Sequence, residues 1–218
     1  MAMALFDLDE TLIHGDCASL WSAHMARIGW VDGDVFVQQD QQLMALYSQG
    51  ELAMEDYMAF SLAPLMGRTP EEVAEQVAGY IAEVIEPRFY PGAREAIDAH
   101  RQIGDRLLVI SASAAFLVQP IAARLGVEEV LAIDLEVLDG RYTGRTLGVL
   151  TYREGKVLRL AQWLELQGET LAGASFYSDS RNDLPLLQAV PRPVAVNPDA
   201  VLLAHAQQAG WEVVEWRL

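Results

Sequence analysis

The sequence predicts an α/β fold in which helices cover both faces of a mostly parallel sheet. Three observations predict it. Short apolar runs typical of buried strands alternate with helical patterns, polar residues follow the ends of several of these runs, and residues 16–85 show helical periodicity without strands. We therefore expect a core made of residues 1–15 and 86–218, with an all-helical unit inserted at 16–85.

The first strand is expected at Met3–Phe6, and two acidic residues, Asp7 and Asp9, follow it. Side chains at positions i and i+2 of an extended segment share one face, so both carboxylates should project together from the carboxyl end of this strand. Such a pair can bind a divalent cation. For an Asp-x-Asp pattern alone, two solvated carboxylates in a loop are the commoner arrangement.

The inserted unit is expected to hold four helices, near residues 18–29, 35–48, 54–66 and 70–85. The fourth has a clear start: Thr69 is an N-cap, Pro70 occupies the first helical position, and a glutamate is placed to complete a capping box. The acidic pair Glu71 and Glu72 is therefore interpreted as structural.

Pro87 and Pro91 mark the return to the core. The elements expected next are a helix at 93–102, a strand at 106–110, a helix at 115–125 with Pro120 early in it, a strand at 130–133 and a hairpin over 135–147. They are followed by a helix at 156–167, a strand at 174–177, a short helix at 184–189, a strand at 194–196, a helix capped at Asn197-Pro198, and an edge strand at 211–216.

Three further polar signals follow in order: Ser111 after an apolar run, Lys156 at the start of a helix, and Asp179 with Asp183 after another run. In open α/β sheets the carboxyl ends of the strands converge on one crevice. Taken singly, each residue has a commoner structural explanation, since Ser111 could end a strand, Lys156 could be solvated and Asp183 could be an N-cap.

With Asp7-Leu8-Asp9-Glu10-Thr11, Ser111, Lys156 and the acidic pair in this order, the chain resembles the haloacid dehalogenase superfamily of phosphohydrolases over roughly residues 4–197. The order and spacing of the four motifs carry the resemblance. It implies a Rossmann-like three-layer α/β/α core, with residues 16–85 as the helical C1 cap of the family.

The resemblance also implies roles. Asp7 would be the nucleophile that forms an aspartyl phosphate, and Asp9 the general acid and base. Asp7, Asp179 and the backbone carbonyl of Asp9 would bind Mg²⁺, which prefers oxygen ligands.

The remaining matched positions have supporting roles in the family. Ser111, Ala112 and Lys156 would bind the phosphoryl oxygens, Asp183 would orient the groups around the metal, and Asn182 would contact the substrate.

Within the superfamily, the chain resembles phosphoserine phosphatases and bacterial histidinol-phosphate phosphatases, whose substrates both carry an amine. Asp16 matches the acidic residue that holds the ammonium group. Phosphoserine phosphatases also bind the substrate carboxylate with a cap arginine, but residues 54–65 contain none, and Arg68 is the nearest. L-Histidinol phosphate, an intermediate of histidine biosynthesis, is therefore the expected substrate, and phosphoserine is the alternative.

Two groups of residues could contact such a substrate. Acidic residues could attract the amine, and aromatic residues could stack on the imidazole, although aromatic residues at helical spacing more often belong to a core. The acidic candidates are Glu51, Glu55 and Asp56, and the aromatic ones are Trp21, Tyr47, Tyr57 and Phe60.

Two other functions share these motifs. A phosphomutase of the same superfamily would also use Asp7 and Asp9. A receiver domain of signalling also combines carboxylates, a hydroxyl and a lysine, but places its phosphoacceptor aspartate on the third strand, whereas Asp179 comes last here.

The net charge and the hydropathy of the sequence limit the classes of partner that we expect. A net charge of −16 over 218 residues disfavours nucleic acid and anionic membranes, yet it permits a small phosphorylated metabolite. No apolar stretch approaches the ~18 residues needed to cross a bilayer, and the amino terminus lacks signal-peptide features, so we expect a cytoplasmic protein. Cys17 is the single cysteine, which excludes an internal disulfide. The oligomeric state stays open.

Overall fold

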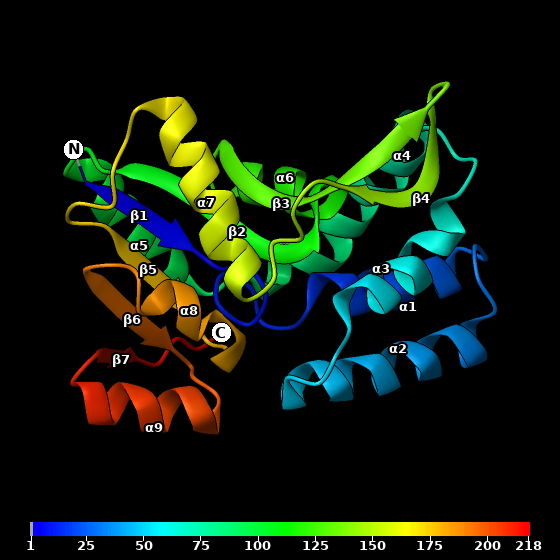
Figure 1. Ribbon diagram of the computed structural model, residues 1–218. Coiled ribbons are helices and arrows are strands. Elements are labelled where there is room, and N and C mark those ends of the chain that lie inside the picture. Colours follow the sequence, from blue (N-terminus) through cyan, green and yellow to red (C-terminus); the bar gives the residue numbers. More distant parts are fainter. Residues whose placement is uncertain (1) are drawn as a thin grey trace.

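The computed structural model describes residues 2–218, and within them seven strands form one sheet in the order β4-β3-β2-β1-β5-β6-β7. Neighbouring strands are parallel except β3 and β4, which are antiparallel. The strands are β1 (Met3–Phe6), β2 (Arg106–Ala114), β3 (Glu129–Leu138), β4 (Arg141–Leu147), β5 (Ser175–Ser178), β6 (Arg192–Val196) and β7 (Glu212–Val214). The expected mostly parallel sheet is confirmed (Figure 1).

Helices cover both faces of this sheet. Along β1, Ala4 and Phe6 belong to one apolar cluster and Met3 and Leu5 to the other, because alternate side chains of a strand point to opposite faces. The first cluster includes residues of α5 (Pro91–Gln102) and α6 (Ala115–Arg124); the second includes residues of α7 (Glu154–Gln167), α8 (Leu184–Leu187) and α9 (Ala200–Ala209). The three-layer α/β/α core is therefore confirmed.

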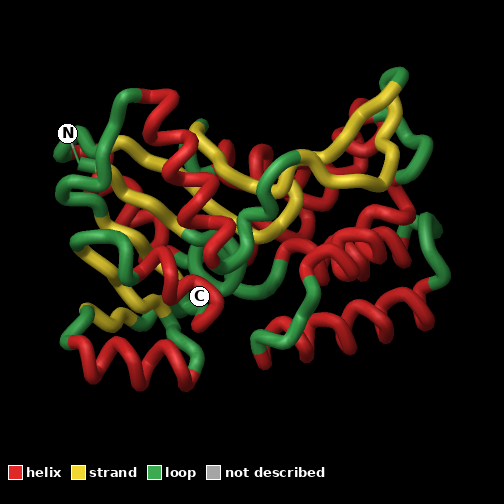
Figure 2. The backbone as a smooth tube through the Cα atoms, viewed as in Figure 1, coloured by secondary structure: helices red, strands yellow, loops and turns green. Residues whose placement is uncertain are grey.

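The segment between β1 and α5 is helical. It contains α1 (Cys17–Arg27), α2 (Gly33–Gln49), α3 (Met54–Leu62) and α4 (Pro70–Tyr80), with short irregular turns at Ala63–Leu65, Ile81–Ile85 and Glu86–Arg88. We refer to α1–α4 as the helical unit. It lies beyond the carboxyl end of β1 (Figures 1 and 2). The division of the chain at residues 16 and 85 remains our proposal.

The predicted capping box at α4 is present. The Thr69 hydroxyl accepts a hydrogen bond from the Glu72 amide, and the Glu72 carboxylate accepts one from the Thr69 amide. Both donors would otherwise be unpaired at a helix start, so the acidic residue is structural as expected.

Three local predictions were wrong. The strand at 130–133 and the first arm of the hairpin form the single strand β3. Pro120 is the sixth residue of α6, where it removes a helical hydrogen bond that would reach the Phe116 carbonyl. The cap of α9 is Asp199, whose carboxylate accepts hydrogen bonds from the amides of residues 201 and 202, while Asn197 binds the main chain of Trp216.

No helix within residues 2–218 combines the length and the apolar character that a membrane span requires.

Candidate active site

Asp7 follows β1 directly and extends the ladder, since its amide donates to the Tyr177 carbonyl at 2.9 Å. Its carboxylate accepts a hydrogen bond from the Lys156 ammonium at 2.9 Å, and the same ammonium donates to Asp183 at 2.8 Å. All three side chains are buried. Lys156, the single lysine of the sequence, therefore lies between two carboxylates drawn from opposite ends of the chain.

Gly155 places Lys156 at this position. A Cβ atom at residue 155 would lie 1.9 Å from the Leu150 carbonyl oxygen, a distance that no side chain tolerates. The glycine lets the start of α7 pack closely on the preceding loop, which brings the lysine beneath the end of β1.

Asp9 contacts a different set of donors. Its carboxylate accepts hydrogen bonds from the Cys17 amide at 2.6 Å, from the Ser113 hydroxyl at 2.8 Å and from the Ser111 hydroxyl at 3.4 Å. The Ser111 oxygen also accepts the Ser113 amide at 3.0 Å. Sequence reasoning missed Ser113, although a second hydroxyl two residues after Ser111 was a visible signal.

An irregularity in β2 turns this segment toward the site. The pairing with β3 is interrupted between Ile110 and Ala114, so residues 111–113 leave the regular ladder. Ala112 and Ser113 line the cavity described below, whereas Ser111 is fully buried behind them. Such bulges commonly redirect side chains next to active sites.

Asp179 follows β5 and accepts a hydrogen bond from the Thr11 hydroxyl at 3.1 Å. Burial, and then the nearby charge of Asp7, raise the pKa of the Asp179 carboxyl above its ordinary value. Burial likewise raises the pKa of Asp7 to about 7, with Asp183 and Asp9 adding to the effect and Lys156 opposing it. The cluster thus holds more negative charge than its lysine neutralises.

The Lys156 side chain stays protonated and positively charged. Burial alone would lower the pKa of its ammonium, but the carboxylates of Asp183 and Asp7 raise the pKa above the ordinary value. The Asp183 carboxylate is further fixed by the Ser178 hydroxyl at 2.7 Å.

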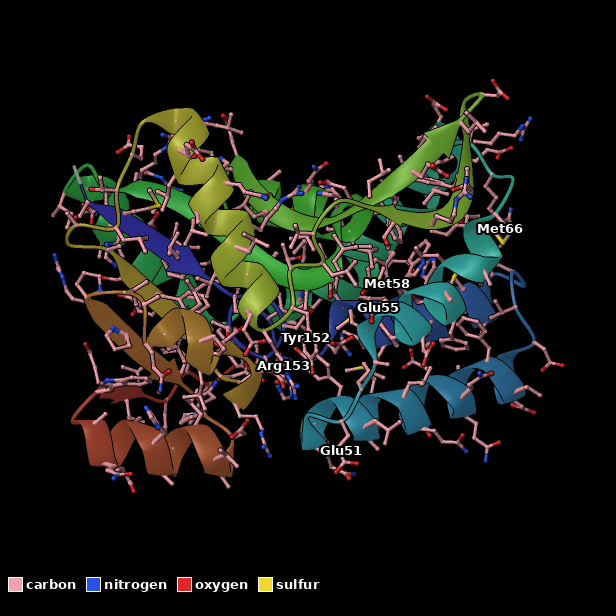
Figure 3. All side chains as sticks on the ribbon, in the orientation of Figure 1. Glu51, Glu55, Met58, Met66, Tyr152 and Arg153 are labelled. Carbon is pink, nitrogen blue, oxygen red and sulfur yellow. The ribbon has the colours of Figure 1, made fainter. Side chains whose placement is uncertain are left out.

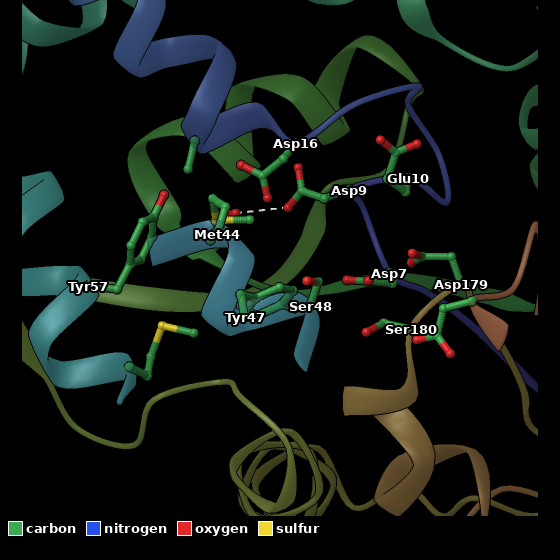
Figure 4. A pocket seen from close by; sticks show the side chains of 15 residues that line it. Asp7, Asp9, Glu10, Asp16, Met44, Tyr47, Ser48, Tyr57, Asp179 and Ser180 are labelled. Carbon is green, nitrogen blue, oxygen red and sulfur yellow. Dashed lines mark hydrogen bonds between the residues drawn. The ribbon is translucent and has the colours of Figure 1, made fainter. Parts of the chain in front are cut away.

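A cavity of about 260 Å³ opens above these carboxylates (Figure 4). One wall comes from the helical unit and the loop that precedes it, and the other from the ends of the core strands. The lining residues are Asp7, Asp9, Glu10, Asp16, Ala18, Met44, Tyr47, Ser48, Met54, Tyr57, Ala112, Ser113, Asp179, Ser180 and Asp199. Six carboxyl groups line the cavity, and this set of described residues contains no lysine, arginine or histidine.

Among the predicted substrate contacts, Asp16, Tyr47 and Tyr57 line the cavity. Asp16 is also the N-cap of α1, because its carboxylate accepts the Ser19 amide at 2.7 Å. Burial, and then the charge of Asp9, raise the pKa of the Asp16 carboxyl.

The other aromatic and acidic candidates lie elsewhere. Phe60 stacks on Phe36 with ring centroids 4.3 Å apart, and Trp21 packs in the interior. Three acidic residues on the surface do not line the cavity: Asp56, and Glu51 and Glu55, which Figure 3 labels.

Asn182 is buried but does not line the cavity. Its amide nitrogen donates to the Tyr47 carbonyl at 3.2 Å, and its amide oxygen accepts from Arg153 Nε at 3.2 Å. Arg153 was missed because nothing local in the sequence indicates this contact, which joins residues far apart in the chain.

The residues implied for Mg²⁺ suit that ion chemically. Within residues 2–218 no three side chains of His, Cys, Asp or Glu converge as a metal cluster. The implied set instead has two carboxylates, Asp7 and Asp179, with one main-chain carbonyl. Mg²⁺ usually retains several waters and needs few protein ligands, and a cation there would offset the burial and the nearby negative charges that raise the pKa of Asp7 and of Asp179.

The chain is similar to known proteins over nearly its whole length. It is 40% identical to a histidinol-phosphatase of Neisseria meningitidis, covering 99% of each chain. It is 32% identical to a phosphoserine phosphatase of Mycobacterium tuberculosis, covering all of this chain and 71% of that protein.

Solved structures share the fold. A Bordetella pertussis protein of unknown function superposes with a TM-score of 0.91 at 39% identity, covering 98% of this chain and 97% of that one. A substrate-bound phosphoserine phosphatase superposes with a TM-score of 0.71 at 20% identity, covering 98% and 92%. At that identity the second likeness concerns the fold alone.

The sequence model of the haloacid dehalogenase-like hydrolases matches residues 4–188, which include all four motifs. The receiver alternative is therefore wrong. The chain belongs to the haloacid dehalogenase-like hydrolase family, and it is a phosphatase of that family.

Proposed function

We propose that this phosphatase hydrolyses L-histidinol phosphate in a Mg²⁺-dependent reaction through an aspartyl phosphate on Asp7. One observation carries the substrate assignment: the cavity is lined by carboxyl groups, aromatic rings and methionines, and its described lining lacks any cationic side chain. A substrate carboxylate enclosed there would have no counter-charge, which is costly, whereas an ammonium group would be stabilised.

The chemistry assigned to the carboxylates is a double displacement. An Asp7 oxygen attacks phosphorus, the phosphorus–oxygen bond to the alcohol breaks, and the carboxyl group of Asp9 gives its proton to the leaving alkoxide. Asp9 then takes a proton from a water molecule that attacks the aspartyl phosphate, which releases phosphate and restores Asp7.

Positive charge and donors must neutralise the phosphoryl oxygens during both steps. Lys156 contacts Asp7 directly, which places its ammonium beside the reacting carboxylate. Ser111 and Ala112 are assigned to the same task. Mg²⁺ held by Asp7, Asp179 and the Asp9 carbonyl would supply further charge neutralisation, and Asp183 would orient this group through Lys156.

The helical unit supplies the substrate contacts in this proposal. Asp16 would bind the ammonium of histidinol phosphate, and Tyr47 or Tyr57 would face its imidazole. Arg68, the nearest arginine to the position used by phosphoserine phosphatases, stacks on Trp30 at 3.7 Å and donates to the Pro64 carbonyl. These two contacts, and not a substrate carboxylate, therefore engage the Arg68 guanidinium. The relative named histidinol-phosphatase supports the same substrate.

The deciding experiment is phosphate release from L-histidinol phosphate and from O-phospho-L-serine in parallel, with Mg²⁺ and with EDTA. A higher kcat/KM for histidinol phosphate supports the proposal, and preference for phosphoserine contradicts the cavity argument. Release without a sugar bisphosphate activator excludes a phosphomutase. Asp7→Asn serves as the blank.

Asp16→Asn is expected to raise KM for histidinol phosphate about tenfold or more, with a smaller change in kcat, because a charge-assisted contact to the ammonium is lost. Asparagine still caps α1. The folded-state pKa of Asp16 lies above the unfolded value, so its ionisation destabilises the fold as pH rises. The variant should therefore gain thermal stability at pH 8 and little at pH 4.

The matched control is Asp32→Asn, at an exposed N-cap of α2 that makes no side-chain capping bond. It should leave KM and the pH dependence of stability unchanged. An unchanged KM in Asp16→Asn would contradict the ammonium contact.

Mg²⁺ is expected to raise the melting temperature more at pH 8 than at pH 5.5. The metal needs ionised ligands, and the raised pKa values of Asp7 and Asp179 mean that protons compete with Mg²⁺ at the lower pH. Differential scanning fluorimetry at both pH values measures this, with Asp179→Asn as the variant that should lose the shift. Equal shifts at the two pH values would contradict the assigned ligands.

A further inference from the structure

The end of α2 is tied to the core by hydrogen bonds that the proposed chemistry does not use. The Arg153 guanidinium donates to the Gly50 carbonyl through Nη2 and to the Asn182 amide oxygen through Nε, the latter at 3.2 Å. Asn182 in turn donates to the Tyr47 carbonyl at 3.2 Å, and the Tyr152 hydroxyl donates to Asn182 at 3.3 Å. We call these five residues the clasp; Figure 3 labels two of them, Tyr152 and Arg153.

The clasp satisfies a helix terminus. The last carbonyls of an α-helix have no helical partner and carry partial negative charge, which a guanidinium stabilises well. Gly50 is the left-handed C-cap of α2, with φ of 72°. A Cβ atom there would lie 2.5 Å from Arg153 Nη2, so a larger residue would force the guanidinium to shift.

The backbone of Arg153 is held in an unusual conformation, with φ of 51° and ψ of −122°. This region suits glycine and is unfavourable for a residue with a Cβ atom. Strained residues persist where surrounding contacts hold them and often mark functional positions. Here the contacts that hold Arg153 include those of its guanidinium and the hydrogen bond that its carbonyl accepts from the Lys156 amide at 3.0 Å.

The clasp links the helical unit to the reacting groups. Arg153 precedes Lys156 by three residues, and Asn182 adjoins Asp183. On the other side, Tyr47 and Ser48 belong to the last turns of α2 and line the cavity. The clasp therefore includes one residue of the cavity lining, Tyr47, and adjoins the segments that hold Lys156 and Asp183.

We propose that Arg153 is a positioning residue that holds the end of α2 against Asn182 and so keeps Tyr47 over the cavity. This gives Asn182 a place in the clasp instead of the substrate contact predicted from the sequence. The inference rests on the proposed function only in the choice of substrate for kinetics, and its main test needs no substrate.

The test uses Cys17 as a reporter of separation between helical unit and core. Cys17 is the single cysteine and is fully buried; its amide binds Asp9 in the core, and its carbonyl accepts the Tyr80 hydroxyl of α4 at 2.7 Å. Its reaction rate with a disulfide reagent therefore measures opening of this junction. Arg153→Gly is the principal variant, because glycine suits the backbone conformation and should preserve folding.

We expect Arg153→Gly to accelerate Cys17 labelling about tenfold, and Arg153→Lys to fall between it and the unmodified protein, since lysine keeps the charge but not the fork of donors. Gly50→Ala should accelerate labelling by displacing the guanidinium. Its controls are Gly29→Ala and Gly67→Ala. They place alanine at a similar positive φ, 74° and 78°, where nothing lies within 4 Å of the added Cβ atom. They should show only the effect of backbone strain.

A double variant isolates the contact. In the Arg153→Gly background, Gly50→Ala has no guanidinium to displace and should change labelling no more than Gly29→Ala does. Labelling of Arg153→Gly within twofold of the unmodified protein would overturn the proposal, as would equal acceleration by Gly50→Ala and Gly67→Ala.

Kinetics separate this inference from the proposed function. With histidinol phosphate, Arg153→Gly should raise KM about tenfold, and with para-nitrophenyl phosphate, which lacks the amine and imidazole, KM should change little. Accelerated labelling without any hydrolysis of histidinol phosphate by the unmodified protein would support the clasp and contradict the substrate. An equal rise of KM for both substrates would contradict positioning of Tyr47.

Discussion

Asp7→Asn is expected to lower kcat for phosphate release by on the order of 10⁴-fold or more, because the amide cannot serve as the nucleophile in the proposed double displacement. Asparagine has nearly the same size and can still accept a hydrogen bond from Lys156, which also retains Asp183. The fold should therefore survive. The measurement is phosphate release under saturating substrate, together with thermal unfolding.

The pH dependence of stability gives a second readout for the same variant. The pKa of Asp7 is raised to about 7 in the folded protein, above the 3.8 of the free side chain, so the folded state binds the proton more tightly. Stability is thus lost as pH rises between these values, in the protein without metal. Asp7→Asn should remove this loss and unfold at a higher temperature than the unmodified protein at pH 8.

Asp139→Asn provides the charge-matched control. Asp139 is exposed in the β3–β4 turn with φ of 50°, a conformation that asparagine also adopts readily. It should change neither kcat nor the pH dependence. A turnover rate of Asp7→Asn close to that of the unmodified protein would contradict the assignment of Asp7 as the nucleophile.

Lys156→Met is expected to produce the largest loss of stability. Methionine fills a similar volume but leaves the buried carboxylates of Asp7 and Asp183 without their cation. Removing one partner of a buried ion pair costs about 3–5 kcal/mol, which corresponds to a fall of roughly 10 °C in melting temperature for a chain of this size. Phosphate release should fall as well, because we propose that the same ammonium neutralises the phosphoryl oxygens.

The pH dependence of the stability loss distinguishes the loss of the ion pair from a packing defect. The carboxylates of Lys156→Met can take up protons at low pH, so the stability difference from the unmodified protein should be larger at pH 8 than at pH 5. Adding Asp183→Asn to Lys156→Met should recover part of the loss, since one uncompensated charge is removed. A difference that is independent of pH would contradict the electrostatic explanation.

Much of the fold could be predicted from local patterns. The four-residue run Met3–Phe6 is fully buried in the centre of the sheet, and the capping box of Thr69 and Glu72 is present as expected. Predictions failed where a local signal had a distant competitor. Asn197 has the composition of a helix cap, but its side chain binds the main chain of Trp216, and Asp199 caps the helix instead.

In the candidate site, too, some features followed from local sequence patterns and others depended on distant contacts. The order of Asp7, Ser111, Lys156 and Asp179 in the sequence was sufficient to indicate a phosphatase, because strand ends in a parallel sheet meet at one edge. Spacing could not show which side chains touch. That Lys156 lies between Asp7 and Asp183 depends on the close approach at Gly155, and that Asp9 is held by Ser113 depends on the interruption of β2.

By itself, then, the sequence determined the fold class and the family, since these depend on residue types and their order along the chain, and it is the basis on which we propose the reacting carboxylates. Only the tertiary structure decided the lining of the cavity and the clasp between Arg153, Gly50 and Asn182. At the end of α2, the bonds from Arg153 to Gly50 and from Asn182 to Tyr47 join positions more than a hundred residues apart. Their physical basis is the packing of one helix end against a loop, which no local pattern in either segment encodes.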